Sequence, residues 1–398
     1  MARHYFTAHL TLTALLFLPV LTSCGGDAAS DSDQPQWSVV EELRIGDIDD
    51  PEQTLSTVGA LVVDDQNRIY VAQPQLGTIR VFDDAGRTLR YIGSRGQAQG
   101  EFDRVYTIGF VADTLYAIDL GLRRVSYFSL EGEHLRSAQV SAPPVTPPFF
   151  PSMPFAVFAD GSMVIGTAFP PSIPPEALRR VPQLRIDGTG TVLDTVTWIG
   201  YERTARRANH EGRPLSVGSP LSDDAFAMFS DDGTRVATLD RTVAPGAGTA
   251  SFGVTMSDGS GDTIYSRRYE YVPVPVDASV IDSIVEERAN ALSGAFEDPR
   301  EAPGFVRSAM FLPVYYPPVS AAQFSDSGEF WVRREALAGQ DQTWMVLDEG
   351  GEPIAHAALP EGLQVMVIGR DALWGVVFDE FEVPYVVRYR VVRGATAE

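Results

Sequence analysis

The sequence predicts an all-β fold built from repeated four-stranded units. Turn signals of the Asp-Gly type separate short runs of β-branched and aromatic residues, which is the pattern of antiparallel strands. The turns that open successive units lie at positions 65, 113, 160, 232, 326 and 371, so the intervals are 48, 47, 72, 94 and 45 residues. A period in the forties with four strands per unit is typical of β-propeller blades.

The two ends of the chain predict that the ring of blades closes on itself. The last unit offers three strand-like runs, QVMVIG, LWGVVFD and YVVRYRVV, whereas Ser38–Gly46 is an unpaired strand-like run near the other end. Placing that run in the last blade removes two exposed sheet edges. We therefore expect a six-bladed β-propeller of four-stranded antiparallel blades, closed by the N-terminal strand. The interval of 94 leaves open a degenerate seventh blade within Glu270–Ser320.

The first unit, ALVVDDQNRIYVAQPQLGTIRVFDDAGRTLRYIG, shows the strand and turn pattern best. It resembles the NHL-repeat type of propeller blade at Tyr70-Val71-Ala72, Val81-Phe82-Asp83, Gly86 and Ile92-Gly93. The resemblance covers Ala60–Val140. It implies the fold rather than a function, because such blades occur in binding scaffolds and in enzymes alike.

The glycine-rich stretch IGSRGQAQGEF, Ile92–Phe102, matches the connector between NHL-type blades. A phosphate-binding loop is excluded, because such a loop needs a strand before it and a helix after it, whereas strand-like runs flank this stretch on both sides. The proline expected after the connector phenylalanine is replaced by Asp103.

One helical insertion is predicted at about 277–296, and the stretch DASVIDSIVEERANAL, which starts at Asp277, is its helix. Asp277 can cap this helix, and its apolar residues fall mostly on one face. We expect the helix to brace the propeller; the alternative is a lid over the central channel.

Residues 1–23 have a short basic start and an apolar core, which indicates an export signal too short to span a membrane as a helix. Leu21-Thr22-Ser23-Cys24 resembles the lipobox of bacterial lipoproteins, which implies cleavage before Cys24 and its acylation. Cys24 is the single cysteine, so an internal disulfide is excluded. The alternative is a simple secretory signal. Residues 24–36 are small and acidic, which predicts a disordered tether before the propeller domain at 37–398.

The formal net charge is -22, and all basic residues are arginine. This charge excludes nucleic acid as a partner and argues against polybasic adhesion to lipid. The absence of lysine from the sequence excludes Schiff-base chemistry. Because Gly25 rather than Asp follows Cys24, we expect a lipid anchor in the bacterial cell envelope, in the outer membrane (periplasmic or surface side) rather than the inner one.

The long loops predict which face is functional. In a four-stranded blade, the loop between the second and third strands and the connector to the next blade lie on one face, here called the long-loop face; the remaining turns form the tight-turn face. Arginines gather in or beside the long-loop face, and guanidinium groups bind carboxylate, sulfate and phosphate groups. The candidate ligand-binding residues are Arg203, Arg206, Arg207, His210, Arg213, Arg123 and Arg124. Pairing of these arginines with neighbouring glutamates as solvated ion pairs is the alternative.

The predicted function is a ligand- or protein-binding module rather than an enzyme. Its partners are the membrane, through the lipid anchor, and an anionic small molecule, a glycan or an envelope protein. The few histidines and asparagines of the mature chain do not converge on a channel, so no catalytic residue, metal site or cofactor is predicted. The alternative is a metal-dependent hydrolase or lyase of the six-bladed propeller type, with a carboxylate-only calcium site left open.

Overall fold

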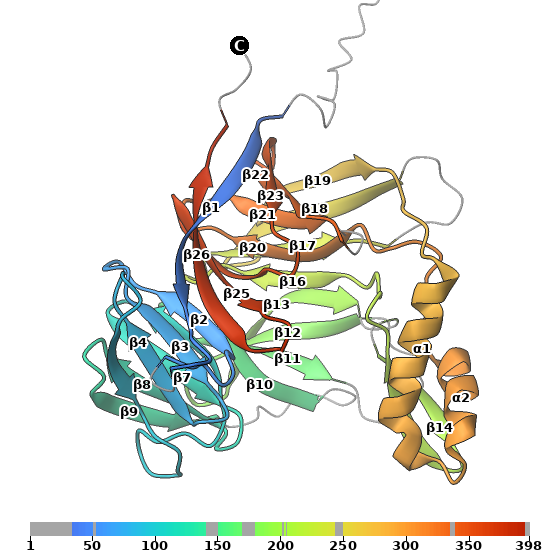
Figure 1. The fold of residues 1–398 in the computed structure, drawn as a ribbon, viewed down its shortest axis with the longest axis horizontal. Coiled ribbons are helices and arrows are strands. Elements are labelled where there is room, and N and C mark those ends of the chain that lie inside the picture. The colour runs from blue at the N-terminus through green and yellow to red at the C-terminus, as the bar shows by residue number, and fades with distance from the viewer. Residues whose placement is uncertain are drawn as a thin grey trace, which may run out of the picture. The chain divides into compact units, whose positions relative to one another are not determined.

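Figure 1 shows the computed structural model of the chain. It describes residues 34–50, 53–140, 150–168, 180–200, 203, 205–242, 250–334 and 339–394. The chain divides into Met1–Gln34 and Pro35–Glu398, and the described residues after 34 all belong to the second unit. The predicted signal peptide and acylated Cys24 lie outside the described residues.

Four four-stranded antiparallel sheets follow one another along the chain, and in each of them neighbouring strands are consecutive in sequence. Their strands are β2 (Ala60–Val63), β3 (Ile69–Gln73), β4 (Thr78–Phe82) and β5 (Thr88–Ile92); β6 (Val105–Val111), β7 (Thr114–Asp119), β8 (Arg124–Ser129) and β9 (His134–Gln139); β10 (Phe150–Val157), β11 (Met163–Ala168), β12 (Arg180–Ile186) and β13 (Val192–Gly200); β16 (Phe226–Phe229), β17 (Arg235–Asp240), β18 (Ala250–Asp258) and β19 (Thr263–Tyr271).

An eight-stranded sheet joins both ends of the folded unit, in the order β20-β21-β22-β23-β1-β26-β25-β24. Its strands are β1 (Gln36–Ile45), β20 (Val319–Phe324), β21 (Phe330–Arg334), β22 (Gln342–Leu347), β23 (Pro353–Leu359), β24 (Gln364–Ile368), β25 (Ala372–Phe378) and β26 (Pro384–Val392). β1 runs antiparallel to β26 from Ser38 to Ile45, and it meets β23 in parallel only at Gln36 and Trp37. The predicted N-terminal strand therefore completes the last sheet, and the fold is all-β with a propeller-like arrangement.

The tight turns form through local side-chain chemistry, as the sequence predicts. In the turn between β4 and β5, Asp83 Oδ1 accepts hydrogen bonds from the backbone N–H groups of Ala85 and Arg87 at 3.1 and 2.8 Å. Gly86 has a φ of 78°, a backbone angle that residues other than glycine rarely adopt. The hydrogen bond from the Arg87 backbone N–H is the main cause that lowers the pKa of Asp83, so the ionised carboxylate holds the turn.

The connector between β5 and β6 contains no helix, so its assignment as a link between two sheets is confirmed. Phe102 at its end is fully buried, with its ring centroid 5.6 Å from that of Phe128 in β8. The aromatic side chain anchors the connector in the core between the first two sheets.

Two helices and a hairpin form a separate packing unit, called the helical insertion below. α1 (Ala278–Leu292) begins where the sequence predicts, with the Asp277 side chain accepting a hydrogen bond from the Ser279 backbone N–H. The 3₁₀ turns η2 (Ser293–Ala295) and η3 (Pro299–Glu301) lead into α2 (Ala302–Ala309). These helices share a buried cluster with β15 (Arg213–Gly218), which pairs with β14 (Ala205–His210). Figure 1 shows β14 beside α2.

The helical insertion differs from the prediction in two ways. It rests largely on its own hairpin, through a shared core that includes Val217, Val285 and Val306, rather than bracing the sheets with one helix. The segment Glu270–Ser320, which is described throughout, holds the helices between the ends of β19 and β20, so it contains no seventh blade. None of the described helices is long and apolar enough to cross a membrane.

Arginines link neighbouring sheets on the tight-turn face. Each such guanidinium donates a hydrogen bond to a backbone carbonyl in a turn of another sheet. The donor and acceptor residues are Arg90 to Leu130, Arg185 to Gly259, Arg235 to Gly328, Arg267 to Gly350 and Arg388 to Asp84. These bonds are charge-assisted and hold successive sheets side by side.

Turn carboxylates of three different sheets lie close enough to repel one another. Partial desolvation by the surrounding protein is the main cause that raises the pKa of Asp326, to about 6, and the charges of Asp231 and Asp65 add to it. Burial also raises the pKa of Asp231. These residues belong to the turns after β20, β16 and β2, so the tight turns of these sheets converge.

Replacing Asp326 with Asn is expected to stabilise the protein at pH 8. The folded-state pKa of Asp326 lies above the unfolded value of about 3.9, so ionisation costs folding free energy that grows as the pH rises through the interval from about 4 to 6. The side chain reaches solvent, so screening reduces the expected gain to about 1 kcal/mol. Thermal unfolding at pH 8 and pH 4 measures it; an equal gain at both values would contradict this cause.

Candidate functional site

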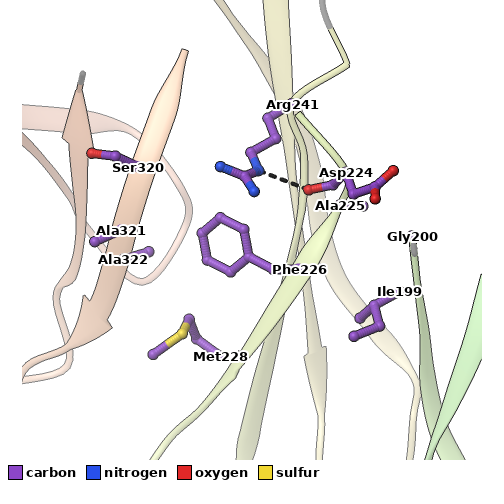
Figure 2. Close-up of a pocket in the computed structure, with 10 residues that line it drawn as sticks. All are labelled: Ile199, Gly200, Asp224, Ala225, Phe226, Met228, Arg241, Ser320, Ala321 and Ala322. Carbon is purple, nitrogen blue, oxygen red and sulfur yellow. Dashed lines mark hydrogen bonds between the residues drawn. The ribbon is translucent and has the colours of Figure 1, made fainter. Parts of the chain in front are cut away.

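A cavity of about 510 Å³ opens on the long-loop face, where β13, β16 and β20 meet. We call it the Arg241 pocket. Figure 2 shows its lining, which comes from the end of β13, the connector into β16, β16 itself, the first residue after β17 and the start of β20. The lining residues are Ile199, Gly200, Asp224, Ala225, Phe226, Met228, Arg241, Ser320, Ala321 and Ala322.

Arg241 is the cationic residue of this pocket. Its Nε donates a hydrogen bond to the Asp224 carbonyl at 2.7 Å, and its Nη1 donates to the Val319 carbonyl at 2.8 Å. The guanidinium carbon lies 4.9 Å from the centre of the Phe226 ring, a cation–π contact. Figure 2 shows the head of Arg241 above the Phe226 ring. These contacts hold a fixed positive charge at one side of an otherwise largely apolar cavity.

Two buried carboxylates fix the connector that forms the pocket wall. Asp223 is 3% exposed and forms an ion pair with Arg203, with 2.6 Å between Nη1 and Oδ2. Asp224 accepts a hydrogen bond from the Arg203 backbone N–H, also at 2.6 Å. The Arg203 guanidinium stacks on Phe311, which follows α2, at 4.8 Å. Arg203, predicted to bind a ligand, thus holds the connector and the helical insertion together near the pocket.

The other members of the predicted arginine cluster belong to the β14–β15 hairpin. Arg206 and Arg207 lie on β14 and Arg213 on β15, and their side chains are outside the described residues. The His210 ring packs 4.3 Å from Phe296 and 5.5 Å from Phe305, between centroids, in the core of the helical insertion. These four residues are therefore not among those that line the Arg241 pocket.

Arg123 and Arg124 lie at the start of β8, in different environments. Arg123 is exposed and has a φ of 51°. Arg124 is only 7% exposed, and its guanidinium donates to the carbonyls of Gln97, Ala98 and Glu101. Since these carbonyls belong to the glycine-rich connector, the Arg124 guanidinium holds that connector, and its predicted part in ligand binding stays a prediction.

Arg241 and Phe226 are not among the binding residues predicted from the sequence. The position of Arg241 in its sheet could have indicated it. Arg241 directly follows the second strand of the sheet, where the loop to the third strand begins on the long-loop face, and Pro74 holds the same position after β3. Carboxylate doublets are usually turn residues, but the side chains of Asp223 and Asp224 are both buried. Among the residues that the structure describes, no group of three or more His, Cys, Asp or Glu side chains is arranged to hold a metal ion.

No protein-family model matches the chain, and no curated protein matches it. Among solved structures, a member of the DUF4221 family from Bacteroides vulgatus is 12% identical over 91% of this chain and 100% of its own, with a TM-score of 0.49. Virginiamycin B lyase from Staphylococcus aureus is 9% identical over 89% of this chain and 100% of its own, with a TM-score of 0.41.

Regucalcin from Agrobacterium tumefaciens, a calcium-binding protein, is 10% identical over 89% of this chain and 96% of its own, with a TM-score of 0.38. The chain's own sheets, with their consecutive four-stranded order and the closing strand β1, carry the assignment of a propeller-like all-β fold.

Proposed function

We propose that the chain is a lipid-anchored binding module of the bacterial cell envelope that takes an amphipathic anion in the Arg241 pocket. The observation that carries this proposal is the pairing of one fixed guanidinium with an apolar floor of Phe226, Met228 and Ile199. A volume of about 510 Å³ falls within the range of small-molecule sites.

The pocket favours one of the three ligand classes that the sequence left open. An organic acid with an aryl or alkyl body would bury that body against Phe226 and Met228 while its acid group meets Arg241. A glycan would leave hydroxyl groups without partners against the apolar floor, which costs free energy. An amphipathic acid therefore suits this pocket better than a sugar.

The proposed location in the cell envelope is based on the N-terminal sequence. Acylation of Cys24 would tether the folded unit through the residues before Pro35, whose carbonyl accepts a hydrogen bond from the His356 backbone N–H. We place the anchor in the outer membrane, on its periplasmic or surface side. An unacylated Cys24→Ala chain should leave the membrane fraction.

We also infer six blades of the NHL-repeat type. The eight-stranded sheet supports this count, because its two four-stranded halves are joined only where Gln36 and Trp37 of β1 meet β23. The four remaining four-stranded sheets would supply the other blades.

Isothermal titration of the full chain in phosphatidylcholine nanodiscs tests the ligand class, with empty nanodiscs subtracted. We expect 4-phenylbutyrate to bind, whereas butyrate lacks the aryl ring and so buries much less apolar surface, and 4-phenylbutanol lacks the charge, so both should bind at least about tenfold more weakly. Arg241→Met should weaken 4-phenylbutyrate binding by about tenfold. Arg300→Met is the matched control, since that side chain is 90% exposed in the helical insertion.

Equal binding of the three probes, or an unchanged affinity in Arg241→Met, would overturn the amphipathic-anion proposal. Loss of thermal stability with a chelator, restored by calcium or zinc, would instead favour the metal-dependent hydrolase or lyase.

A further inference from the structure

A second cavity, of about 260 Å³, opens on the long-loop face between the first and second sheets. We call it the connector pocket. Pro74 and Gln75 from the loop after β3 form one side, and Arg95 from the glycine-rich connector with Asp103 and Arg104, which directly follow that connector, form the other. The binding function proposed above uses none of these residues.

Hydrogen bonds within the connector fix the backbone that carries Arg95. The Phe102 backbone N–H donates to the Ser94 carbonyl at 2.8 Å, and that of Gly96 donates to the Phe102 carbonyl at 3.1 Å. The buried Arg124 guanidinium adds bonds to the connector carbonyls from below, the shortest being 2.6 Å to Glu101. The glycine-rich stretch is therefore a shaped loop rather than a loose link.

A buried carboxylate positions the other two charged residues of the pocket. Asp119, which has no exposed surface, accepts hydrogen bonds from the backbone N–H groups of Asp103 at 2.8 Å, Arg104 at 3.2 Å and Leu122 at 2.9 Å. These bonds hold the start of β6 in place, so the side chains of Asp103 and Arg104 leave from a fixed backbone. Preorganisation of this kind is what a binding site requires.

The two walls of the pocket are also fixed to each other. Arg95 Nη1 donates to the Gln75 carbonyl at 2.7 Å. Gly77 allows the approach, because a Cβ there would lie 2.9 Å from the Arg95 Cα and 2.7 Å from the Phe102 carbonyl oxygen. The Arg95–Gln75 hydrogen bond and the close approach at Gly77 therefore hold the two walls together.

The charges in the pocket do not neutralise each other directly. Within the described part of the chain, Arg95, Arg104 and Asp103 form no ion pair, although all three line the same cavity. The pocket thus offers cationic donors and an anionic acceptor at once, with Pro74 as its largest apolar contribution. An amphipathic acid would find little apolar surface here, and an ionised inorganic phosphate would bring few hydrogen-bond donors for Asp103.

We propose that the connector pocket binds a uronic acid unit of an acidic saccharide. Its carboxylate would accept hydrogen bonds from Arg95 and Arg104, and its ring hydroxyls would donate to Asp103 and to the Gln75 side-chain oxygen. A sugar acid presents both a carboxylate and several hydroxyl donors within a small volume. The chain then carries two sites of different chemistry on one face.

The test compares three probes by isothermal titration against the full chain in nanodiscs: methyl glucuronide, methyl glucoside and tetrahydropyran-2-carboxylate. Methyl glucuronide should bind about tenfold more tightly than the sugar without the carboxylate or the acid without the hydroxyls. Equal binding of the glucoside would overturn the role of the arginines, and equal binding of the tetrahydropyran acid would overturn sugar recognition.

Variants locate the site. Arg104→Gln should weaken methyl glucuronide binding by about tenfold, whereas Arg87→Gln removes the same charge from the tight-turn face and should change nothing. Gly121→Ala should also weaken it, because the new Cβ would displace the Asp103 carboxylate, whose Oδ2 lies 1.9 Å from that position. Arg241→Met should leave it unchanged, so the two sites can fail independently. Unaltered binding in both Arg104→Gln and Gly121→Ala would overturn the proposal.

Discussion

Replacing Trp37 with Ala is expected to lower the free energy of unfolding by about 4 kcal/mol. Trp37 is 6% exposed and lies at the point where β1 leaves β26 and meets β23. Its ring centroid is 5.8 Å from that of Trp331, and the Arg393 guanidinium lies 4.4 Å above it. The substitution therefore opens a cavity at the junction between the two halves of the eight-stranded sheet.

Val40→Ala is the matched control, because Val40 lies on the same strand and is 46% exposed. It should cost well under about 1 kcal/mol. Urea unfolding followed by tryptophan fluorescence and by circular dichroism measures both variants. If the Trp37→Ala protein were as stable as the Val40→Ala protein, the contact of Trp37 with the last sheets would not stabilise the fold, which would contradict the closing role of the N-terminal strand.

The closing strand could be predicted from the sequence by counting the strand-like runs in each unit. The last unit had three strand-like runs, and one unpaired run remained at the other end. The tight turns were predictable as well, since an aspartate such as Asp83 folds back onto its own backbone. The start of α1 could also be predicted, because Asp277 caps the helix through a hydrogen bond within its own neighbourhood in the sequence.

The hairpin and α2 were missed because their stability comes from partners distant in sequence. The residues of β14 and β15 are mostly polar or small, so their sequence pattern predicts a loop. In the structure, Ala208, Leu215 and Val217 pack against α1 and α2, and this contact stabilises the hairpin. A sequence pattern carries no record of such a surface. The same limit explains why α2, with only eight residues, was not predicted.

The candidate site was harder to predict, because an arginine in a sequence does not reveal what its guanidinium contacts. Arg124 donates to three carbonyls of its own fold, and Arg203 pairs with a buried carboxylate. Arg241 also contacts carbonyls, but it borders a cavity. Burial and cavity position separate these roles, and both depend on tertiary structure.

Replacing Asp119 with Ala is expected to cost about 4 kcal/mol of unfolding free energy. The carboxylate has no exposed surface and accepts hydrogen bonds from three backbone N–H groups, which the substitution leaves without an acceptor. Asp113→Asn is the matched control, since Asp113 lies in an exposed turn of the same sheet. Thermal and urea unfolding measure the difference, and a loss no larger than that of the control would contradict the role of Asp119.

Asp119→Asn separates stability from recognition. The amide keeps the size of the side chain but offers one acceptor oxygen in place of two, so the chain should remain folded with a smaller loss of stability. Asp103 and Arg104 would lose part of their backbone restraint, and methyl glucuronide binding should weaken while 4-phenylbutyrate binding at Arg241 stays unchanged. If both ligands weakened together, the substitution would act through global stability, and the connector would not be a preorganised site.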